Sequence, residues 1–339
     1  MTDAGAVTRV LVPHWHAAEI GEPCRSIDDE LAERHGRTVL RLAARFPFVL
    51  GFLIFRAARD FDRVGVVLKA PGALVFTLLE AWVARRHDRL VLLTFLPREP
   101  SHRPFVDLAL RIRFAIIERP SIRRAMRAGH VLTRAEQTRY AERYRIPPER
   151  FHHIPWAYSA GSTPAAKQDG GVGVVSSGRA FCDWETLFAA ASRALWPLTV
   201  ICSERDAPRI HELNEDGRAR VLVEIPDAEH NRLLREAAIY AMCLRDEGPS
   251  AGHVRLLAAV DAGVSVVASD VPGLVGYIEP GETAIMVPPG DPDRLEAAIS
   301  SLMTDPSLRE KLAARASARA AAWTYRDFWG ALRDLLVAE

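Results

Sequence analysis

The sequence predicts an α/β protein built from two doubly wound, Rossmann-like domains. Short runs of β-branched residues alternate with amphipathic helical segments, and one stretch of small and polar residues, 157–171, interrupts the alternation before it restarts. Strands that alternate with helices are typical of a parallel sheet covered by helices on both faces. A chain of 339 residues also has room for two domains of about 150 residues each.

The composition is that of a globular protein. Hydrophobic residues make up 49% of the chain and charged residues 26%, with a formal net charge of +1, which argues against a disordered or generally nucleic-acid-binding chain. The positive charge is nevertheless concentrated, because residues 85–150 contain 16 Arg, no Lys and 7 Asp or Glu. The first half of the chain is therefore basic, and the remainder is acidic.

The spacing of the cysteines and the lack of a recognisable secretory signal predict a cytoplasmic protein. The four cysteines show no metal-ligand or redox spacing, as expected for free thiols in a reducing compartment. The first residues lack the basic and apolar regions of a secretory signal. The longest apolar run, 46–55, is shorter than the ~20 residues of a spanning helix. We interpret it as a core segment in preference to an interfacial one.

The first predicted domain covers residues 1–156. His14 and His16 lie in a predicted loop, 13–21, directly after the first strand. Ligands of open α/β sheets bind at this end of the strands, so the two histidines are candidates for binding, with a histidine-rich surface turn as the equal alternative. The predicted strands are 7–12, 64–68, 90–95 and 129–132, and the predicted helices are 27–35, 73–84 and 134–144.

Residues 104–126 form a predicted amphipathic helix with apolar and arginine-rich faces. Several basic residues near an anionic leaflet, each worth ~1 kcal/mol, would give reversible attachment to a membrane surface. The alternative is a solvated helix face. The membrane interpretation would place the protein peripherally at the inner face of the membrane.

The second predicted domain covers residues 172–322, after the linker 157–171, and a C-terminal helix at 323–339 is expected to pack back on the first domain. The predicted strands of this domain are 172–176, 198–202, 220–224, 239–244 and 264–267. The predicted helices are 183–195, 208–214, 227–237, 253–262, 292–303 and 307–322. Before the helix at 253–262, the small residues Ser250, Ala251 and Gly252 form a loop that suits an anion, since the helix N-terminus offers free N–H groups.

Several segments resemble the retaining glycosyltransferases of family 4, the glycosyl transferases group 1. The segment 259–273 is similar to the helix–strand–loop pattern of that family, and 277–292 is similar to the segment that follows. Ser177-Gly178-Arg179 and the stretch 132–155 also resemble family elements. The resemblance implies a GT-B fold, in which two Rossmann-like domains face a cleft, and a nucleotide-sugar donor bound by the second domain.

The resemblance also assigns roles to individual residues. Gly178 and Arg179 would approach the donor pyrophosphate, with Arg179 as a cationic clamp. Residues Ser250, Ala251, Gly252 and His253 would present backbone N–H groups to the donor. Ile225 and Pro226 belong to the loop that holds the base. The alternatives are a surface arginine for Arg179 and a simple turn for Gly178; their place at a strand end, with the rest of the pattern, favours the donor-binding role.

Departures from the family pattern concern its acidic residues. The family carries two glutamates eight positions apart, and the equivalent positions here are Ser250 and Ala258. Glu247 could supply a carboxylate by a different loop path, or it could be an ordinary salt-bridged residue. The lysine that follows the Gly-Arg element is missing. The family's catalytic histidine has three candidates, His14, His16 and His102, and no motif chooses among them.

The sequence therefore predicts a metal-independent, retaining glycosyltransferase with no cofactor other than its nucleotide-diphosphate-sugar substrate. The basic first domain suggests an acceptor that is lipid-linked or membrane-proximal, while a small-molecule acceptor remains open. The alternative is a non-catalytic relative that acts as a binding or partner subunit. A nucleotide-sugar epimerase of the same architecture ranks last.

Overall fold

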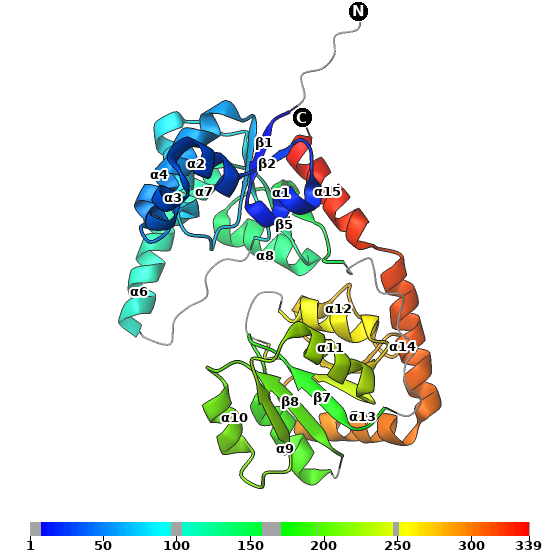
Figure 1. The fold of residues 1–339 in the computed structure, drawn as a ribbon. Coiled ribbons are helices and arrows are strands. Elements are labelled where there is room, and N and C mark those ends of the chain that lie inside the picture. Colours follow the sequence, from blue (N-terminus) through cyan, green and yellow to red (C-terminus); the bar gives the residue numbers. More distant parts are fainter. Residues whose placement is uncertain (1–7, 96–103, 158–170, 195, 247–250, 339) are drawn as a thin grey trace, which may run out of the picture. The chain divides into compact units, whose positions relative to one another are not determined.

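The computed structural model describes residues 8–95, 104–157, 171–194, 196–246 and 251–338. These residues form two units, one from residues 1–155 with 328–339, and one from residues 156–327. Each unit contains a six-stranded parallel sheet with helices around it (Figure 1). The prediction of two α/β domains of Rossmann type is confirmed.

The sheet of the first unit has the strand order β2-β1-β3-β4-β5-β6. Its strands are β1 (Val10–Val12), β2 (Cys24–Ser26), β3 (Arg63–Val66), β4 (Leu90–Leu92), β5 (Met126–Val131) and β6 (Phe151–His153). The helices are α1 (His14–Ile20), α2 (Ile27–His35), α3 (Arg37–Ala43), α4 (Pro47–Ala57), α5 (Ala73–Leu79), α6 (Pro104–Arg113), α7 (Arg119–Ala125) and α8 (Arg134–Tyr144). The central strands are buried on both faces, as their continuous runs of apolar residues require.

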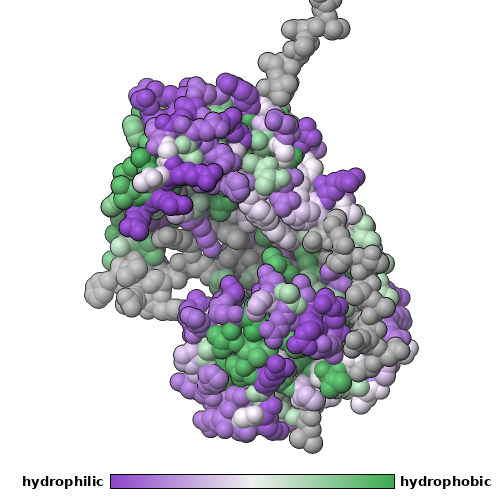
Figure 2. Space-filling view, viewed as in Figure 1, coloured by the Kyte–Doolittle hydropathy of each residue, from purple (hydrophilic) through white to green (hydrophobic). Residues whose placement is uncertain are grey.

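One prediction about this unit is wrong, and a second is confirmed only in part. The segment that holds His14 and His16 is not a loop, because α1 begins directly after Pro13. The apolar run 46–55 is only half core: α4 buries Gly51, Ile54 and Phe55 and leaves a second apolar side in solvent. Figure 2 shows hydrophobic residues at the surface of this unit. The ten-residue run carries apolar residues all round the helix, and its sequence alone does not specify the buried side.

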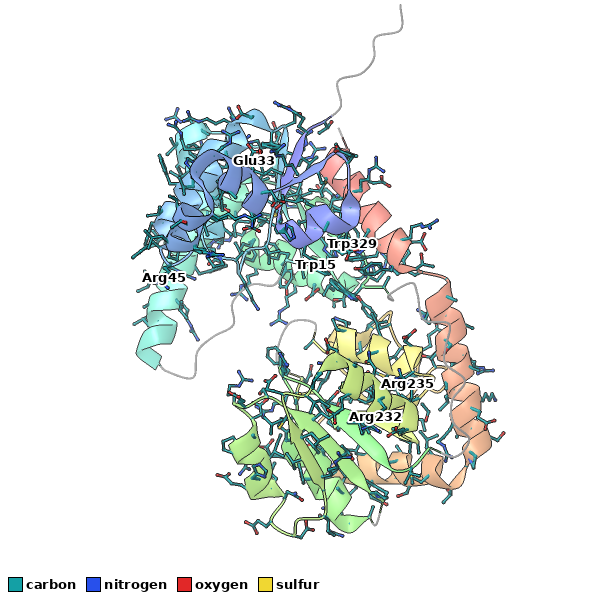
Figure 3. All side chains as sticks on the ribbon, viewed as in Figure 1. Trp15, Glu33, Arg45, Arg232, Arg235 and Trp329 are labelled. Atoms are coloured by element: carbon teal, nitrogen blue, oxygen red, sulfur yellow. The ribbon has the colours of Figure 1, made fainter. Side chains whose placement is uncertain are left out.

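A closing helix, α15 (Tyr325–Val337), contributes to the core of the first unit. Phe328 and Leu332 are 1% and 0% exposed. The ring of Trp329 lies 5.0 Å from that of Trp15 in an edge-to-face contact, and both are labelled in Figure 3. Edge-to-face aromatic pairs add stabilisation beyond the area they bury, so α1 and α15 hold each other in place.

The second unit repeats the architecture with the strand order β12-β11-β10-β7-β8-β9. Its strands are β7 (Val174–Ser177), β8 (Leu198–Cys202), β9 (Arg220–Val223), β10 (Ile239–Met242), β11 (Ser265–Ser269) and β12 (Ile285–Val287). Its helices are α9 (Trp184–Arg193), α10 (Ala207–Leu213), α11 (Asp227–Glu236), α12 (His253–Asp261), α13 (Pro292–Thr304) and α14 (Pro306–Ala321). These elements follow the predicted alternation closely, apart from β12, which was not predicted.

Glu80 and Arg89 form a buried ion pair in the first unit. Glu80 begins a π-helical turn that extends α5, and Arg89 precedes β4. The Nε and Nη2 atoms of Arg89 donate to the two carboxylate oxygens of Glu80 at 2.7 and 2.5 Å, and its Nη1 donates to the carbonyls of Ala58 and Phe61. Glu80 is 0% exposed and Arg89 is 6% exposed. The guanidinium therefore joins three segments of the chain.

We expect Arg89→Met to destabilise the first unit by about 3–5 kcal/mol, because it leaves the Glu80 carboxylate buried without its counter-charge. Urea unfolding measured by circular dichroism would show the loss. Arg86→Met, at an exposed position three residues earlier, is the matched control and should change stability by less than about 0.5 kcal/mol. Equal effects of the two substitutions would contradict the structural role of the pair.

Candidate functional site

The second sheet has a topological switch point between β7 and β10. From β7 the chain adds β8 and then β9 on one side, and it returns to place β10 on the other side of β7. Loops that leave the carboxyl ends of two such strands diverge and open a crevice, where ligands of open α/β sheets bind. The predicted Gly178–Arg179 element follows β7, and the predicted 250–253 segment follows β10. The sheet therefore brings these two elements to the same edge.

Gly178 stands where the chain leaves β7, and a larger residue there would require the buried Cys182 side chain to move. A Cβ at this position would lie 2.2 Å from the Sγ of Cys182. The amide of Gly178 still donates to the Ile201 carbonyl of β8 at 3.3 Å, so the residue ends the strand rather than forming a free turn. The 178–183 loop is held to the segment after β10 by two backbone hydrogen bonds, from the Asp183 amide to the Cys243 carbonyl and from the Arg245 amide to the Phe181 carbonyl.

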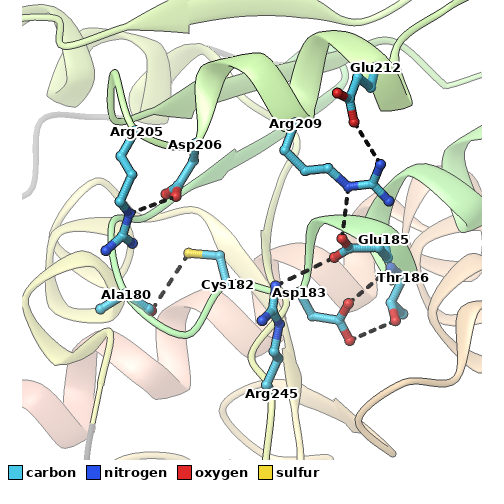
Figure 4. Close-up of polar contacts among 10 residues, drawn as sticks. All are labelled: Ala180, Cys182, Asp183, Glu185, Thr186, Arg205, Asp206, Arg209, Glu212 and Arg245. Atoms are coloured by element: carbon cyan, nitrogen blue, oxygen red, sulfur yellow. Dashed lines mark hydrogen bonds and ion pairs between the residues drawn. The ribbon is translucent and has the colours of Figure 1, made fainter. Parts of the chain in front are cut away.

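The loop is fixed at its far end by the cap of α9 (Figure 4). Asp183 accepts from the Thr186 amide at 3.1 Å and from the Thr186 hydroxyl at 2.7 Å. In the same turn, Glu185 accepts from the Nε of Arg209 at 3.1 Å and pairs with Arg245 at 3.6 Å. These contacts satisfy the first turn of the helix and tie it to α10 and to the segment after β10.

Arg179 projects into solvent beside the end of β9. Its side chain is 63% exposed, and its Nη2 pairs with the Oε2 of Glu224 at 2.5 Å. Its own carbonyl accepts from the Nη2 of Arg205 at 3.0 Å. Glu224, which sequence reasoning missed, holds a left-handed backbone with a φ of 49°. The guanidinium is thus at the sheet edge where an anion would bind, with a carboxylate already on one side of it.

A buried polar cluster lies beneath the Gly178 turn. The Oγ of Ser177 is 2.9 Å from the Nε2 of His230 and 3.1 Å from the hydroxyl of Tyr240. The Tyr240 hydroxyl also donates to the Ser177 carbonyl at 2.9 Å. His230 is 1% exposed, and burial, helped by Arg255, lowers its pKa to about 4. The cluster therefore holds the end of β7 with neutral groups.

The predicted base loop connects β9 to α11. Ile225 is partly buried against the core of this unit. Pro226 is exposed and precedes the first residue of α11, with its carbonyl accepting from the His230 amide at 3.0 Å. The loop therefore presents Pro226 and the start of α11 at the sheet edge, next to Glu224.

At the other side of the switch point, Gly252 takes a left-handed φ of 81° and begins α12 without a side-chain cap. Ala251 precedes it in irregular structure. His253 is 4% exposed, its Nε2 donates to the Gly273 carbonyl at 2.7 Å, and its ring packs on Tyr277 at 4.2 Å. The side chain of His253 is thus used internally, and only its backbone remains for a ligand. Glu247 and Ser250 lie outside the described residues.

In the first unit, the structure gives His14 and His16 different surroundings. His14 is exposed on α1, 3.3 Å from the Ser26 hydroxyl and 3.5 Å from Asp29. His16 is 4% exposed, contacts the rings of Trp15 and Trp329, and has no partner for its Nδ1 in the part of the chain that the structure describes. Burial lowers the pKa of His16 to about 4. His102 lies outside the described residues.

His130, at the end of β5, is a buried histidine that sequence reasoning missed. It is 0% exposed. Its Nδ1 accepts from the Thr94 amide at 3.2 Å and its Nε2 donates to the Ile154 carbonyl at 2.8 Å. Burial lowers its pKa to about 4. No local pattern marks this role, since its partners are 36 and 24 residues away.

Within the described ranges, no group of three or more His, Cys, Asp or Glu residues is placed to hold a metal ion. Asp291 and Asp293 form an Asp-x-Asp pair at the start of α13. Asp291 accepts from the Arg294 amide at 3.0 Å as the cap of that helix, and Asp293 pairs with Arg193. None of the helices in the described ranges has the length and hydrophobicity to span a membrane.

We expect His230→Phe to flatten the pH dependence of stability between pH 6.5 and 4. The unfolded state, with a histidine pKa near 6.5, binds a proton there that the folded state, with a pKa of about 4, does not bind. Stability present above pH 6.5 is therefore lost as the pH falls, by up to about 1.4 kcal/mol per pH unit.

At pH 7 the free energy of unfolding of the variant should be about 1 kcal/mol lower than that of the wild type, the value of one hydrogen bond. This difference should shrink as the pH is lowered. Urea unfolding at several pH values is the measurement. His211→Phe, on the exposed side of α10, is the control and should follow the wild-type curve. A parallel shift of the His230→Phe curve at all pH values would contradict this titration.

Comparison with known proteins gives one family and many structural neighbours. Residues 184–305 match the model of the family described as glycosyl transferases group 1. Over 103 residues the chain is 33% identical to the phosphatidyl-myo-inositol mannosyltransferase of Mycolicibacterium smegmatis. That match covers 30% of this chain and about a quarter, 26%, of the mannosyltransferase.

The solved structures are similar over nearly the whole chain. HepE of Anabaena in complex with UDP-glucose gives a TM-score of 0.71 at 17% identity, covering 98% of this chain and 100% of that one. WaaG, a glycosyltransferase involved in lipopolysaccharide biosynthesis, gives 0.64 at 14% identity, with 97% and 100% covered. At these identities the likeness concerns the fold. The chain thus has the GT-B fold of glycosyltransferases, and its residues 184–305 match the glycosyl transferases group 1.

Proposed function

We propose that the protein is a glycosyltransferase that takes a sugar from a nucleotide-diphosphate-sugar donor bound to the second unit. The observation that carries the proposal is the switch point, where the Gly178–Arg179 element after β7 and the start of α12 after β10 share one sheet edge. The family match covers most of this unit. A neighbour with the same fold was solved with UDP-glucose, which supports a nucleotide-sugar donor here.

The chemistry of such a site rests on stabilising the departing diphosphate. Arg179 supplies an exposed guanidinium, able to bind two phosphate oxygens at once. The first turn of α12 supplies free backbone N–H groups and the positive end of the helix dipole. Gly252 has no side chain because the end of the Met242 side chain fills the space that a Cβ would take, so the segment offers a ligand its backbone only. Charge that develops on the leaving group is stabilised most by donors already fixed in position, and we propose that this is done without a metal ion.

The neutral cluster below the loop fits this scheme. Ser177, His230 and Tyr240 fix the end of β7 through hydrogen bonds between uncharged groups. A protonated His230 would bind the donor diphosphate equally well before and during the reaction, and so would not favour the transition state. Because the cluster is neutral, we propose that Arg179 supplies the side-chain positive charge that binds the diphosphate.

We propose further that transfer retains the anomeric configuration, as in the family that the sequence resembles. The test is proton NMR of the product within the first turnovers, which should show the configuration of the donor. A product of inverted configuration would overturn this part of the proposal and leave glycosyl transfer itself intact.

The proposed acceptor is lipid-linked or membrane-proximal and is bound by the first unit. The curated relative is named for a phosphatidyl-myo-inositol acceptor, and the first half of this chain is strongly basic between residues 85 and 150. His14, His16 and Glu247 remain the proposed candidates for groups that act on the acceptor or the sugar. Burial lowers the pKa of His16 to about 4, so its ring carries no charge at neutral pH.

The alternative proposal is a non-catalytic binding or partner subunit. Two observations favour it: Ala258, where a glutamate is expected, is partly buried on α12, and Glu224 already pairs with Arg179. A subunit of this kind would bind a nucleotide without turning over its sugar.

We expect Arg179→Ala to lower kcat/KM for the donor by about a hundredfold, the effect of removing one preorganised donor to developing charge. The measurement is donor hydrolysis or transfer by the purified protein over a panel of nucleotide sugars. Arg193→Ala, on the same unit at the far end of α9, is the matched control and should retain wild-type turnover.

A second variant separates the two proposals. Glu224→Gln removes the competing carboxylate, so nucleoside diphosphate binding measured by calorimetry should be as tight as in the wild type or tighter. Binding without turnover over the whole panel would favour the non-catalytic subunit. No nucleotide binding by the wild type would overturn both proposals.

A further inference from the structure

Helices α3 and α4 expose an apolar surface in the first unit. We call it the α3–α4 face, and its apolar members are Val39, Leu42, Phe46, Phe48, Val49 and Phe52, all 47–78% exposed. Phe48 is the most exposed of them at 78%. Three aromatic rings exposed within seven residues are unusual for a surface that faces water.

The packing of α4 against α5 determines which side of α4 is exposed. Gly51 faces α5, where a Cβ would lie 2.6 Å from the Gly72 carbonyl oxygen and from the Cβ of Val75. Ile54 and Phe55 are buried next to this contact. The close approach at Gly51 fixes the rotation of the helix, so Phe48, Val49 and Phe52 point away from the core. Their exposure therefore follows from the core packing.

Positive charge surrounds the apolar residues. The stretch 37–59 contains five Arg and no Asp or Glu. Arg37 and Arg41 lie one turn apart on α3, and Arg45, labelled in Figure 3, belongs to the connection between the two helices. Arg56 continues the stripe of Phe48 and Phe52 at four-residue spacing. Among the described residues, no ion pair involves Arg37, Arg41, Arg45 or Arg56.

Exposed aromatic rings flanked by positively charged arginines are suited to the surface of an anionic lipid bilayer. A bilayer rich in anionic lipid offers phosphates for the guanidinium groups and an acyl boundary for the rings, and short amphipathic helices lie in that plane. A second copy of this chain would bring its own five arginines against these five, which opposes self-association. Figure 2 shows hydrophobic and hydrophilic residues mixed over this side of the unit.

We propose that the α3–α4 face is the docking surface of the protein for an anionic lipid bilayer. Phe46, Phe48 and Phe52 enter the boundary between head groups and acyl chains, and Arg37, Arg41, Arg45 and Arg56 contact lipid phosphates. This surface is distinct from the predicted basic helix at 104–126, and the proposal does not depend on the activity of the second unit.

The test is co-sedimentation of the full chain with vesicles of phosphatidylcholine, with and without phosphatidylglycerol. The wild type should bind only the anionic vesicles, and less at high salt. Phe48→Glu combined with Phe52→Glu should reduce the partition at least about tenfold. Val172→Glu combined with Val275→Glu replaces equally exposed apolar residues of the second unit and should bind as the wild type does. Circular dichroism and calorimetry with nucleoside diphosphate check that each variant is folded.

Four outcomes would overturn the proposal. The wild type could fail to bind anionic vesicles, or the double phenylalanine variant could bind them as well as the wild type. Arg119→Glu combined with Arg123→Glu could abolish binding while the phenylalanine variant retains it, which would place the contact on the 104–126 segment. Size-exclusion chromatography adds the remaining case: a concentration-dependent dimer that is lost in the phenylalanine variant would assign the face to a second copy.

Discussion

The candidate site of the second unit is built on the end of β7, where the Cys182 side chain packs directly against Gly178. A side chain at position 178 would collide with the Cys182 sulfur, so a larger residue there would require this buried cysteine to move. Arg179 follows directly, and Asp183 of the same loop caps α9. Burial raises the pKa of the Cys182 thiol to about 12, so the sulfur acts here through its volume.

Buried histidines form a second theme of the structure. His16, His130, His230 and His253 are each at most 4% exposed, and burial lowers each pKa to about 4. Through their Nε2 atoms, His130 and His253 donate to backbone carbonyls, and His230 hydrogen-bonds the Ser177 hydroxyl at the end of β7. At neutral pH these rings carry no charge, so they connect polar groups without adding to the positive charge of the arginines.

The sequence predicted the architecture well because its signals are local. The capped helix at 134–144 and the strand at 198–202 were predicted with the observed bounds. Several elements that were missed lack such signals: α1 has no side-chain cap, and β2, β6 and β12 have three residues each, too few to show a period. Helices α3 and α4 were also missed; apolar residues lie all round α4, so its sequence shows no helical period.

The candidate site could be predicted only in part. Gly178 and Arg179 were found because they belong to a recognisable pattern next to a strand. Glu224 and His230 were not found, because each meets its partner across 45 or 53 residues, and no spacing rule connects residues that only the sheet order brings together. Likewise, the exposed side of α4 depends on the contact of Gly51 with α5, which a helical wheel does not contain.

The division of the first unit between the two ends of the chain has a consequence for biosynthesis. Its sheet is encoded before residue 156, but Phe328, Leu332 and Leu336, which complete its core, are made after the whole of the second unit. On the ribosome the second unit can finish folding while the first still exposes the hydrophobic surface that α15 covers. During that interval the first unit is a natural client for chaperones, and release of α15 from the ribosome completes its core.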